Sequence, residues 1–107
     1  MVNGKLPFKF GRVDKDFYCC DCPSLTSLEG APQTVGWNFS CSECTSLKSL
    51  KGVQQEVGGT FDCRKCTSLT SLEGGPQTVG RDFRCSDCSS LKSLEGAPKK
   101  IGGRFIN

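Results

Sequence analysis

The sequence predicts a solenoid, in which the chain winds through a series of stacked coils, and two repeating patterns carry this prediction. The pair Cys-x-x-Cys recurs with a step of 22 residues, at Cys19/Cys22, Cys41/Cys44, Cys63/Cys66 and Cys85/Cys88. A phenylalanine and a β-branched residue recur with the same step, at Phe17, Phe39, Phe61, Phe83 and Phe105 and at Val13, Val35, Val57, Val79 and Ile101. A fixed period of this length is typical of stacked repeats, so we expect residues at one position of the repeat to lie above one another in space.

The third repeat shows how one coil is expected to fold. Residues 60–63 alternate polar and apolar side chains, which is typical of a short strand. Apolar residues then follow at every third position, through Cys66, Leu69 and Leu72, and a step of three suits a tight arc better than a strand. The segment 74–76, Gly-Gly-Pro, ends the arc in a turn because proline cannot continue a helix or a central strand.

Stacking this coil predicts four 22-residue coils with one parallel β-sheet and a convex side of turns or 3₁₀ segments. We expect short strands near residues 16–19, 38–41, 60–63, 82–85 and 104–106. The domain boundaries are predicted as an N-terminal cap over 1–12 and a solenoid over 13–107, with repeats 13–34, 35–56, 57–78 and 79–100 and a partial repeat 101–107. A different phase of the pattern would add a second short strand at Ser-Leu-x-Gly.

The run Val-Gly-Gly-x-Phe-x-Cys-x-x-Cys-x-x-Leu-x-x-Leu, at residues 57–72, resembles the leucine-rich repeat pattern. The phrases Cys-Thr-Ser-Leu-Lys-Ser-Leu (44–50) and Cys-Thr-Ser-Leu-Thr-Ser-Leu (66–72) resemble the bacterial Treponema or BspA-like subfamily, and the Ser-Leu-Glu-Gly-Ala-Pro cassette is similar to repeats of bacteria and tailed phages. The resemblance covers roughly residues 6–107 and implies a leucine-rich-repeat-like, right-handed stack. The chain departs from the commonest subfamilies because its convex side has no clear helix pattern.

The paired cysteines allow two interpretations. A free thiol packs like a small apolar side chain, and both cysteine columns coincide with predicted core positions, so we favour packing and expect no cofactor. Cys-x-x-Cys is also a half-site for zinc or an iron–sulfur cluster, which makes a metal-holding protein the alternative. Its candidate ligands are Cys19, Cys22, Cys41 and Cys44 for one site and Cys63, Cys66, Cys85 and Cys88 for a second. Against this alternative, the first cysteine of each pair lies in a strand, which does not aim both sulfurs at one point.

Composition and motifs narrow the classes of function. The chain has 107 residues, a net charge of +3 and no histidine, and it lacks a Gly-rich phosphate loop or a Gly-x-Ser-x-Gly elbow, so we do not expect an enzyme. Basic and acidic residues are interspersed, so nucleic acid is not an expected partner. We find no apolar stretch of membrane-spanning length and no secretory h-region in residues 1–17, so we expect a cytoplasmic location, which is the host cytoplasm if a phage encodes the protein. Reduced thiols follow from that location, whereas a signal peptide removed beforehand would restore the disulfide interpretation.

The coils differ from one another mainly at positions on and beside the predicted strands. Trp37, the only tryptophan, occupies a position held in other coils by Lys15, Gly59 and Arg81. Exposed aromatic residues beside arginine are typical of interface hot spots, and the sheet face of a solenoid is its usual binding side. We therefore predict a non-catalytic protein-binding module with partner-binding residues Tyr18, Trp37, Asn38, Ser40, Asp62, Arg64, Lys65, Arg81 and Arg84. The resemblance to phage and bacterial repeats implies an adaptor or inhibitor of a host protein.

Two further expectations concern single positions. Cys20 shares its repeat position with polar residues, so we expect it to face outward, and no histidine is present to activate it. The sequence stops within a predicted fifth strand, and an uncovered strand edge invites pairing. We therefore predict an end-to-end homodimer in which Arg104, Phe105 and Ile106 mediate self-association.

Overall fold

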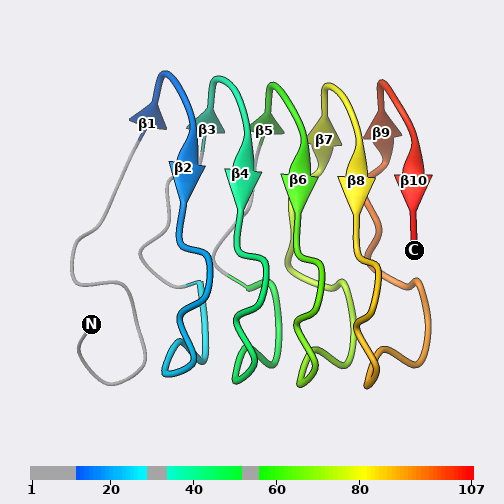
Figure 1. Ribbon diagram of the computed structural model, residues 1–107. Helices are drawn as coiled ribbons and strands as arrows, with labels where there is room; N and C mark the ends of the chain where they lie inside the picture. Colours follow the sequence, from blue (N-terminus) through cyan, green and yellow to red (C-terminus); the bar gives the residue numbers. More distant parts are fainter. Residues whose placement is uncertain (1–11, 29–33, 52–55) are drawn as a thin grey trace.

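The computed structural model describes residues 12–28, 34–51 and 56–107, and these form a β-solenoid of four turns with a 22-residue period (Figure 1). The described residues contain strands, turns and bends but no helix of any kind. The convex side, predicted as turns or 3₁₀ segments, consists of turns in this part of the chain. Most of the predicted N-terminal cap, 1–12, lies outside the described residues.

Each turn contributes two strands of two residues, and equivalent strands of successive turns pair in parallel. The phenylalanine sheet contains β2 (Phe17–Tyr18), β4 (Phe39–Ser40), β6 (Phe61–Asp62), β8 (Phe83–Arg84) and β10 (Phe105–Ile106). These strands confirm the five that the sequence predicted. The valine sheet contains β1 (Arg12–Val13), β3 (Thr34–Val35), β5 (Glu56–Val57), β7 (Thr78–Val79) and β9 (Lys100–Ile101). In both sheets each residue pairs with the residue 22 positions later, as the repeat requires.

The valine sheet corrects the prediction of a single sheet. Its strands lie behind those of the phenylalanine sheet in Figure 1 and precede them in each turn. The phenylalanine strands lie within an alternating run such as residues 60–63, whereas each valine strand after β1 runs directly into a corner glycine, so no alternating run marks it in the sequence. The other candidate for a second strand, Ser-Leu-x-Gly, forms no strand in the described residues.

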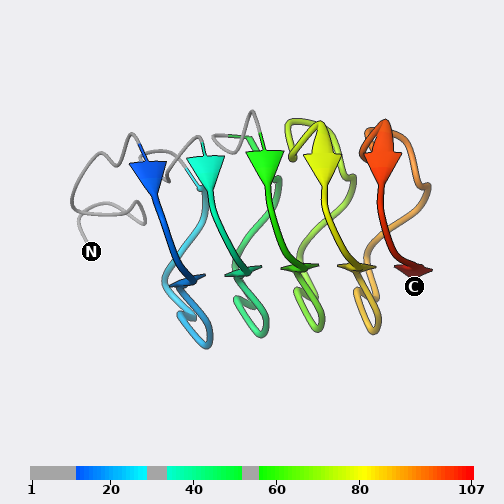
Figure 2. The same ribbon diagram turned by 90° about the horizontal axis from the view of Figure 1, so that it is seen from above.

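The chain bends between the two strands of every turn, as Figure 2 shows from above. The first residue of this corner is glycine in four turns, at Gly36, Gly58, Gly80 and Gly102. A Cβ atom on Gly58 would lie 2.2 Å from the carbonyl oxygen of Gly36, and the other three positions are equally close to the turn below. Glycine is required here because successive backbones approach each other without room for a side chain.

Repeated apolar side chains fill the space inside the coils. Adjacent phenylalanine rings of the stack from Phe17 to Phe105 have centroids 5.0–5.3 Å apart. Phe39, Phe61 and Phe83 are fully buried, as are the leucines of the inner turns. Full burial of each such side chain stabilises the fold by roughly 1.5–3 kcal/mol, so the stack is the main source of stability.

A column of polar side chains links the turns just before the phenylalanine strands. The side chain of Asp16 accepts a hydrogen bond from the Asn38 N–H at 2.9 Å, and Asn38 Oδ1 accepts one from the Thr60 N–H at 2.8 Å. Thr60 Oγ1 accepts from the Asp82 N–H at 3.4 Å, and Asp82 Oδ1 accepts from the Arg104 N–H at 2.9 Å. Each turn is therefore tied to the next by a side chain that satisfies a backbone donor beside the sheet.

Candidate partner-binding site

Two adjoining hollows lie on the outer surface where the corner meets the phenylalanine sheet. The corner hollow has a volume of about 280 Å³ and is lined by Gly36, Trp37, Asn38, Gly58, Gly59 and Arg81. The strand hollow has a volume of about 250 Å³ and is lined by Tyr18, Asn38, Phe39, Ser40, Thr60, Asp62 and Arg84. Asn38 lines both, so the two hollows form one continuous candidate site.

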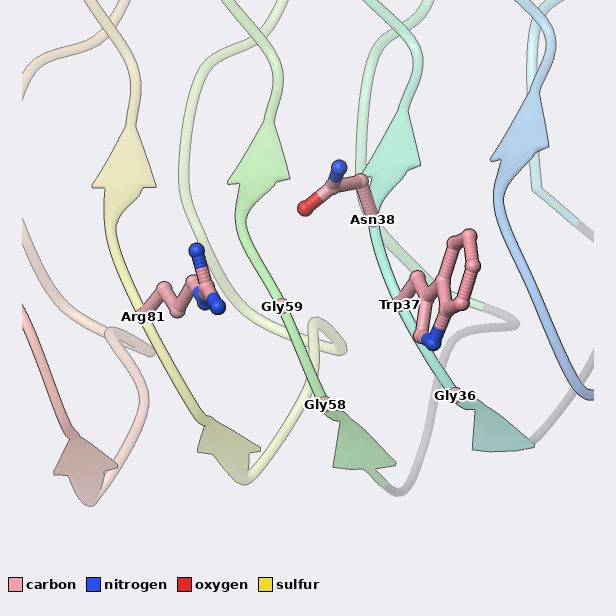
Figure 3. A pocket seen from close by; sticks show the side chains of 6 residues that line it. All are labelled: Gly36, Trp37, Asn38, Gly58, Gly59 and Arg81. Atoms are coloured by element: carbon pink, nitrogen blue, oxygen red, sulfur yellow. The ribbon is translucent and has the colours of Figure 1, made fainter.

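Trp37 and Arg81 flank the corner hollow from turns that are separated by one turn (Figure 3). The intervening turn has Gly59 at this position, so its backbone forms the floor between the two side chains. Trp37 is 55% exposed, and the Lys15 ammonium lies 5.8 Å from the centroid of its ring. This cation–π contact favours one orientation of an exposed indole.

Backbone spacing explains how one column holds both glycine and large side chains. The N–H of Gly59 donates to the Trp37 carbonyl at 2.6 Å, and the N–H of Gly103 donates to the Arg81 carbonyl at 2.7 Å. Where the donor has a side chain, the spacing is wider: 3.3 Å from Trp37 to Lys15 and 3.0 Å from Arg81 to Gly59. The glycine turns therefore sit closer to the turn below, which leaves room on their outer side.

The strand hollow combines an aromatic ring with opposite charges. Tyr18 is 61% exposed, and a hydrogen bond with the Asp16 side chain raises its pKa. The single N–H of Arg64 Nε is shared between the two carboxylate oxygens of Asp62, at 3.0 and 3.1 Å. Arg84 lies 3.7 Å from Asp82, but its Nε is buried without a hydrogen-bond partner in the described part of the protein.

The two hollows bring together seven of the nine predicted partner-binding residues: Tyr18, Trp37, Asn38, Ser40, Asp62, Arg81 and Arg84. Ser40 is only 7% exposed because the Cys20 thiol lies 3.0 Å from its hydroxyl, so it offers little surface to a partner. Arg64 reaches the site through Asp62, whereas Lys65 lies in a separate hollow and contacts Glu43 at 3.7 Å.

Sequence reasoning missed the glycine floor and part of the role of Asn38. The signal for the floor was present in the sequence, since Gly59 shares a repeat position with Trp37 and Arg81. Asn38 was predicted for partner binding, but its Oδ1 already accepts the Thr60 N–H. This contact occupies one of the two lone pairs of that oxygen, and the Asn38 side chain also hydrogen-bonds Tyr18.

The second cysteine of the last three pairs donates a hydrogen bond into the turn below, whereas Cys22 donates to the Cys20 carbonyl of its own turn. Cys44 Sγ donates to the Cys19 carbonyl at 3.0 Å, and the pairs Cys66–Cys41 and Cys88–Cys63 repeat this contact at 3.1 Å. Between the two cysteines of each pair, the backbone passes through the left-handed region at Asp21, Glu43, Lys65 and Asp87. This turn directs the second sulfur inward, so the thiols fill the core and satisfy backbone carbonyls.

All nine cysteines are free thiols, and Cys20 is exposed as predicted. The hydrogen bond between the thiols of Cys41 and Cys66, together with burial, raises the pKa of Cys41 well above its ordinary value. Burial raises the pKa of Cys85 to about 11. Within the residues that the structure describes, no group of three or more Cys, Asp or Glu side chains is arranged to hold a metal ion.

The three predicted self-association residues lie in or beside β10, which pairs with β8 on one side only. The Arg104 N–H is bonded to Asp82, and Phe105 stacks on Phe83. These contacts lie within one chain and do not test the end-to-end homodimer, which stays a prediction. Sedimentation that detects only monomers at high protein concentration would count against it.

No helix in the described ranges has the length and apolar character needed to cross a membrane. Comparisons of the chain with protein-family models, curated proteins and solved structures give no match. Any functional argument must therefore begin from the geometry of the two hollows.

Proposed function

We propose that the protein is a non-catalytic binding module that presents the corner hollow and the strand hollow to another protein. The observation that carries the proposal is the placement of two exposed aromatic residues, Trp37 and Tyr18, beside adjoining hollows that also contain arginine. Aromatic and arginine side chains are the most frequent hot-spot residues in protein interfaces.

The rigidity of the backbone beneath these side chains supports the proposal. The strands under the hollows are paired in register, and the polar column from Asp16 to Arg104 fixes the spacing of the turns. A preorganised surface loses little conformational entropy on binding, which favours affinity without a large buried area.

The proposed family and host relationship rest on the sequence resemblance. The inward leucines and the cysteine at the ladder position are compatible with a leucine-rich repeat of the Treponema or BspA-like type. Similar repeats in bacteria and tailed phages lead us to propose an adaptor or inhibitor that acts on a host protein in the cytoplasm.

A pull-down from a candidate host lysate, with Trp37→Ala and Tyr18→Ala as variants, tests the proposed function. We expect each variant to lose at least about tenfold in affinity for the captured partner, since a hot-spot truncation typically costs about 2 kcal/mol. Leu94→Ala is the matched control, because Leu94 is 44% exposed but lies outside both hollows. Full retention of the partner by both aromatic variants would show that this face is not the binding surface.

A metal-holding function remains the alternative from the sequence, and nothing in the arrangement of the thiols favours it over packing. Elemental analysis of the purified protein decides between them: stoichiometric zinc or iron would support the metal-holding function.

A further inference from the structure

We propose that the corner hollow recognises an acidic–aromatic segment of the partner, with a planar side chain over Gly59 and a neighbouring carboxylate on Arg81. This inference rests on the proposed binding function and assigns the chemistry of its ligand. Three features of the hollow lead to it: its width, its floor of glycine backbone and its unbalanced charge.

The width of the corner hollow suits one planar group. Trp37 and Arg81 stand two turns apart, and a spacing of about 4.8 Å per turn separates their backbones by about 9.6 Å. A flat ring needs roughly 3.5 Å of contact distance on each side, so one ring fits over Gly59 between the turns of Trp37 and Arg81. Figure 3 shows the indole on the side of its turn away from Gly59, so the space above the glycine is open. The volume of about 280 Å³ is enough for a single aromatic side chain but not for an extended apolar cluster.

Three backbone polar groups of the glycine floor are already hydrogen-bonded, although the lining of the hollow as a whole is mainly polar. The N–H of Gly58 already donates to the Val35 carbonyl at 2.8 Å, and that of Gly59 donates to the Trp37 carbonyl. The Gly59 carbonyl accepts from the Arg81 N–H. With these groups satisfied, a ring above the two glycines loses no hydrogen bonds by covering them.

The side chains around the hollow provide positive charge and hydrogen-bond donors, which favours an anionic ligand. Arg81 forms no ion pair with the described residues, and the polar hydrogens of Trp37, Asn38 and Arg81 are all potential donors. Asn38 Oδ1, the acceptor among these side chains, is occupied by the Thr60 N–H. Lys15 adds a second positive charge behind the indole.

Three carboxylates in the neighbouring turns are already engaged. Asp14 pairs with Arg12 at 3.0 Å, Asp16 accepts the Asn38 N–H, and Asp82 accepts the Arg104 N–H and lies near Arg84. An incoming carboxylate therefore has Arg81 as an unpaired, bidentate donor, and such charge-assisted pairs are stronger than neutral hydrogen bonds.

The test is an NMR titration of the full chain with three peptides that differ at one residue. The probes are acetyl-Gly-Phe-Asp-Gly-amide, its neutral counterpart with Asn in place of Asp, and its basic counterpart with Lys. We expect the Asp peptide to bind about fivefold more tightly than the Asn peptide and to shift the amide signals of Gly58 and Gly59 and the indole N–H of Trp37. In the variant Arg81→Gln this preference for Asp should disappear, whereas Arg12→Gln, which removes an equal charge elsewhere, should keep it.

Several outcomes would overturn the inference. They are equal binding of the Asp, Asn and Lys peptides, no binding of any of them below about 10 mM, and an Asp preference that survives Arg81→Gln. Uridine monophosphate serves as a fourth probe because a nucleotide also joins a ring to an anion, and tighter binding of this probe than of the Asp peptide would contradict a peptide ligand. These results can be distinguished from those of the pull-down. If Trp37→Ala loses the partner but the titration shows no preference for the Asp peptide, this inference is wrong and the proposed function still stands.

Discussion

Two columns of equivalent residues in the corner differ in how much variation they tolerate, although they are formed by consecutive positions of each turn. The column of Gly58 is glycine in four turns, whereas the column of Gly59 also holds lysine, tryptophan and arginine. A Cβ atom in the first column would point at a backbone carbonyl 2.2 Å away. In the second column, a side chain is accommodated when the turn moves out by a few tenths of an ångström. The comparison shows that close contact between turns restricts a position to one residue type in nearly every turn. A position that faces solvent can vary between turns and can therefore acquire a binding role.

The largest expected effect separates these two columns. Gly58→Ala should destabilise the protein by about 3 kcal/mol, because the added methyl group meets a backbone carbonyl that cannot move without displacing a whole turn. Gly59→Ala should cost less, about 1–2 kcal/mol. Its Cβ would lie 2.4 Å from Asn38 Oδ1 and 2.7 Å from the Trp37 carbonyl oxygen, but the turns of Trp37 and Arg81 accommodate a side chain at this position with a wider spacing. Urea denaturation of both variants measures the difference. Equal losses would mean that the second column is no more tolerant than the first.

The buried first thiols of the pairs predict a loss of stability above pH 9. The hydrogen bonds with Cys19 and Cys63 lower the pKa of Cys44 and Cys88 to about 7, so those two thiols act in the opposite sense between pH 7 and 9 only. The folded-state pKa values of Cys41, Cys63 and Cys85 are raised, so their contribution is complete below the ordinary thiol value near 9 and is lost as pH rises above it. The unfolded state then releases protons that the folded state keeps, and the free energy of unfolding falls by about 1.4 kcal/mol per pH unit for each such thiol.

Chemical denaturation at pH 7, 9 and 10 under reducing conditions checks this dependence. Cys63→Ala should reduce the slope above pH 9, whereas Cys20→Ala, which removes an exposed thiol, serves as its control. A flat profile from pH 9 to 10 would contradict a buried sulfur column.

The polar column predicts a smaller and residue-specific effect. Asn38→Ala removes the acceptor of the Thr60 N–H and should cost about 1–2 kcal/mol. Asn38→Asp keeps an acceptor, as Asp16 and Asp82 do at the same position, and should stay within about 0.5 kcal/mol of the parent. Thermal unfolding of the pair measures this, and equal destabilisation by both substitutions would show that the contact contributes little.

Periodicity predicted the fold because a core side chain meets its own equivalent in the next turn. The strands at the phenylalanine positions, the buried cysteine columns and the outward Cys20 all follow from the 22-residue step. The valine sheet was missed because its strands after β1 run directly into the corner glycines and leave no alternating pattern, whereas the equally short phenylalanine strands lie within one.

The candidate site was predicted less completely than the fold. Variation between repeats pointed to Trp37 and Arg81, but the floor between them depends on the absence of a side chain at Gly59. The burial of Ser40 and the hydrogen bond of Asn38 depend on contacts between turns, which no single repeat position reveals.

The account rests on a division between inward columns that build the solenoid and outward side chains that bind a partner. Measuring partner affinity and unfolding free energy on the same Trp37→Ala protein tests this division most directly. We predict at least about a tenfold loss of affinity with the unfolding free energy within about 0.5 kcal/mol of the parent. Unchanged affinity, or a stability loss of several kcal/mol, would contradict it.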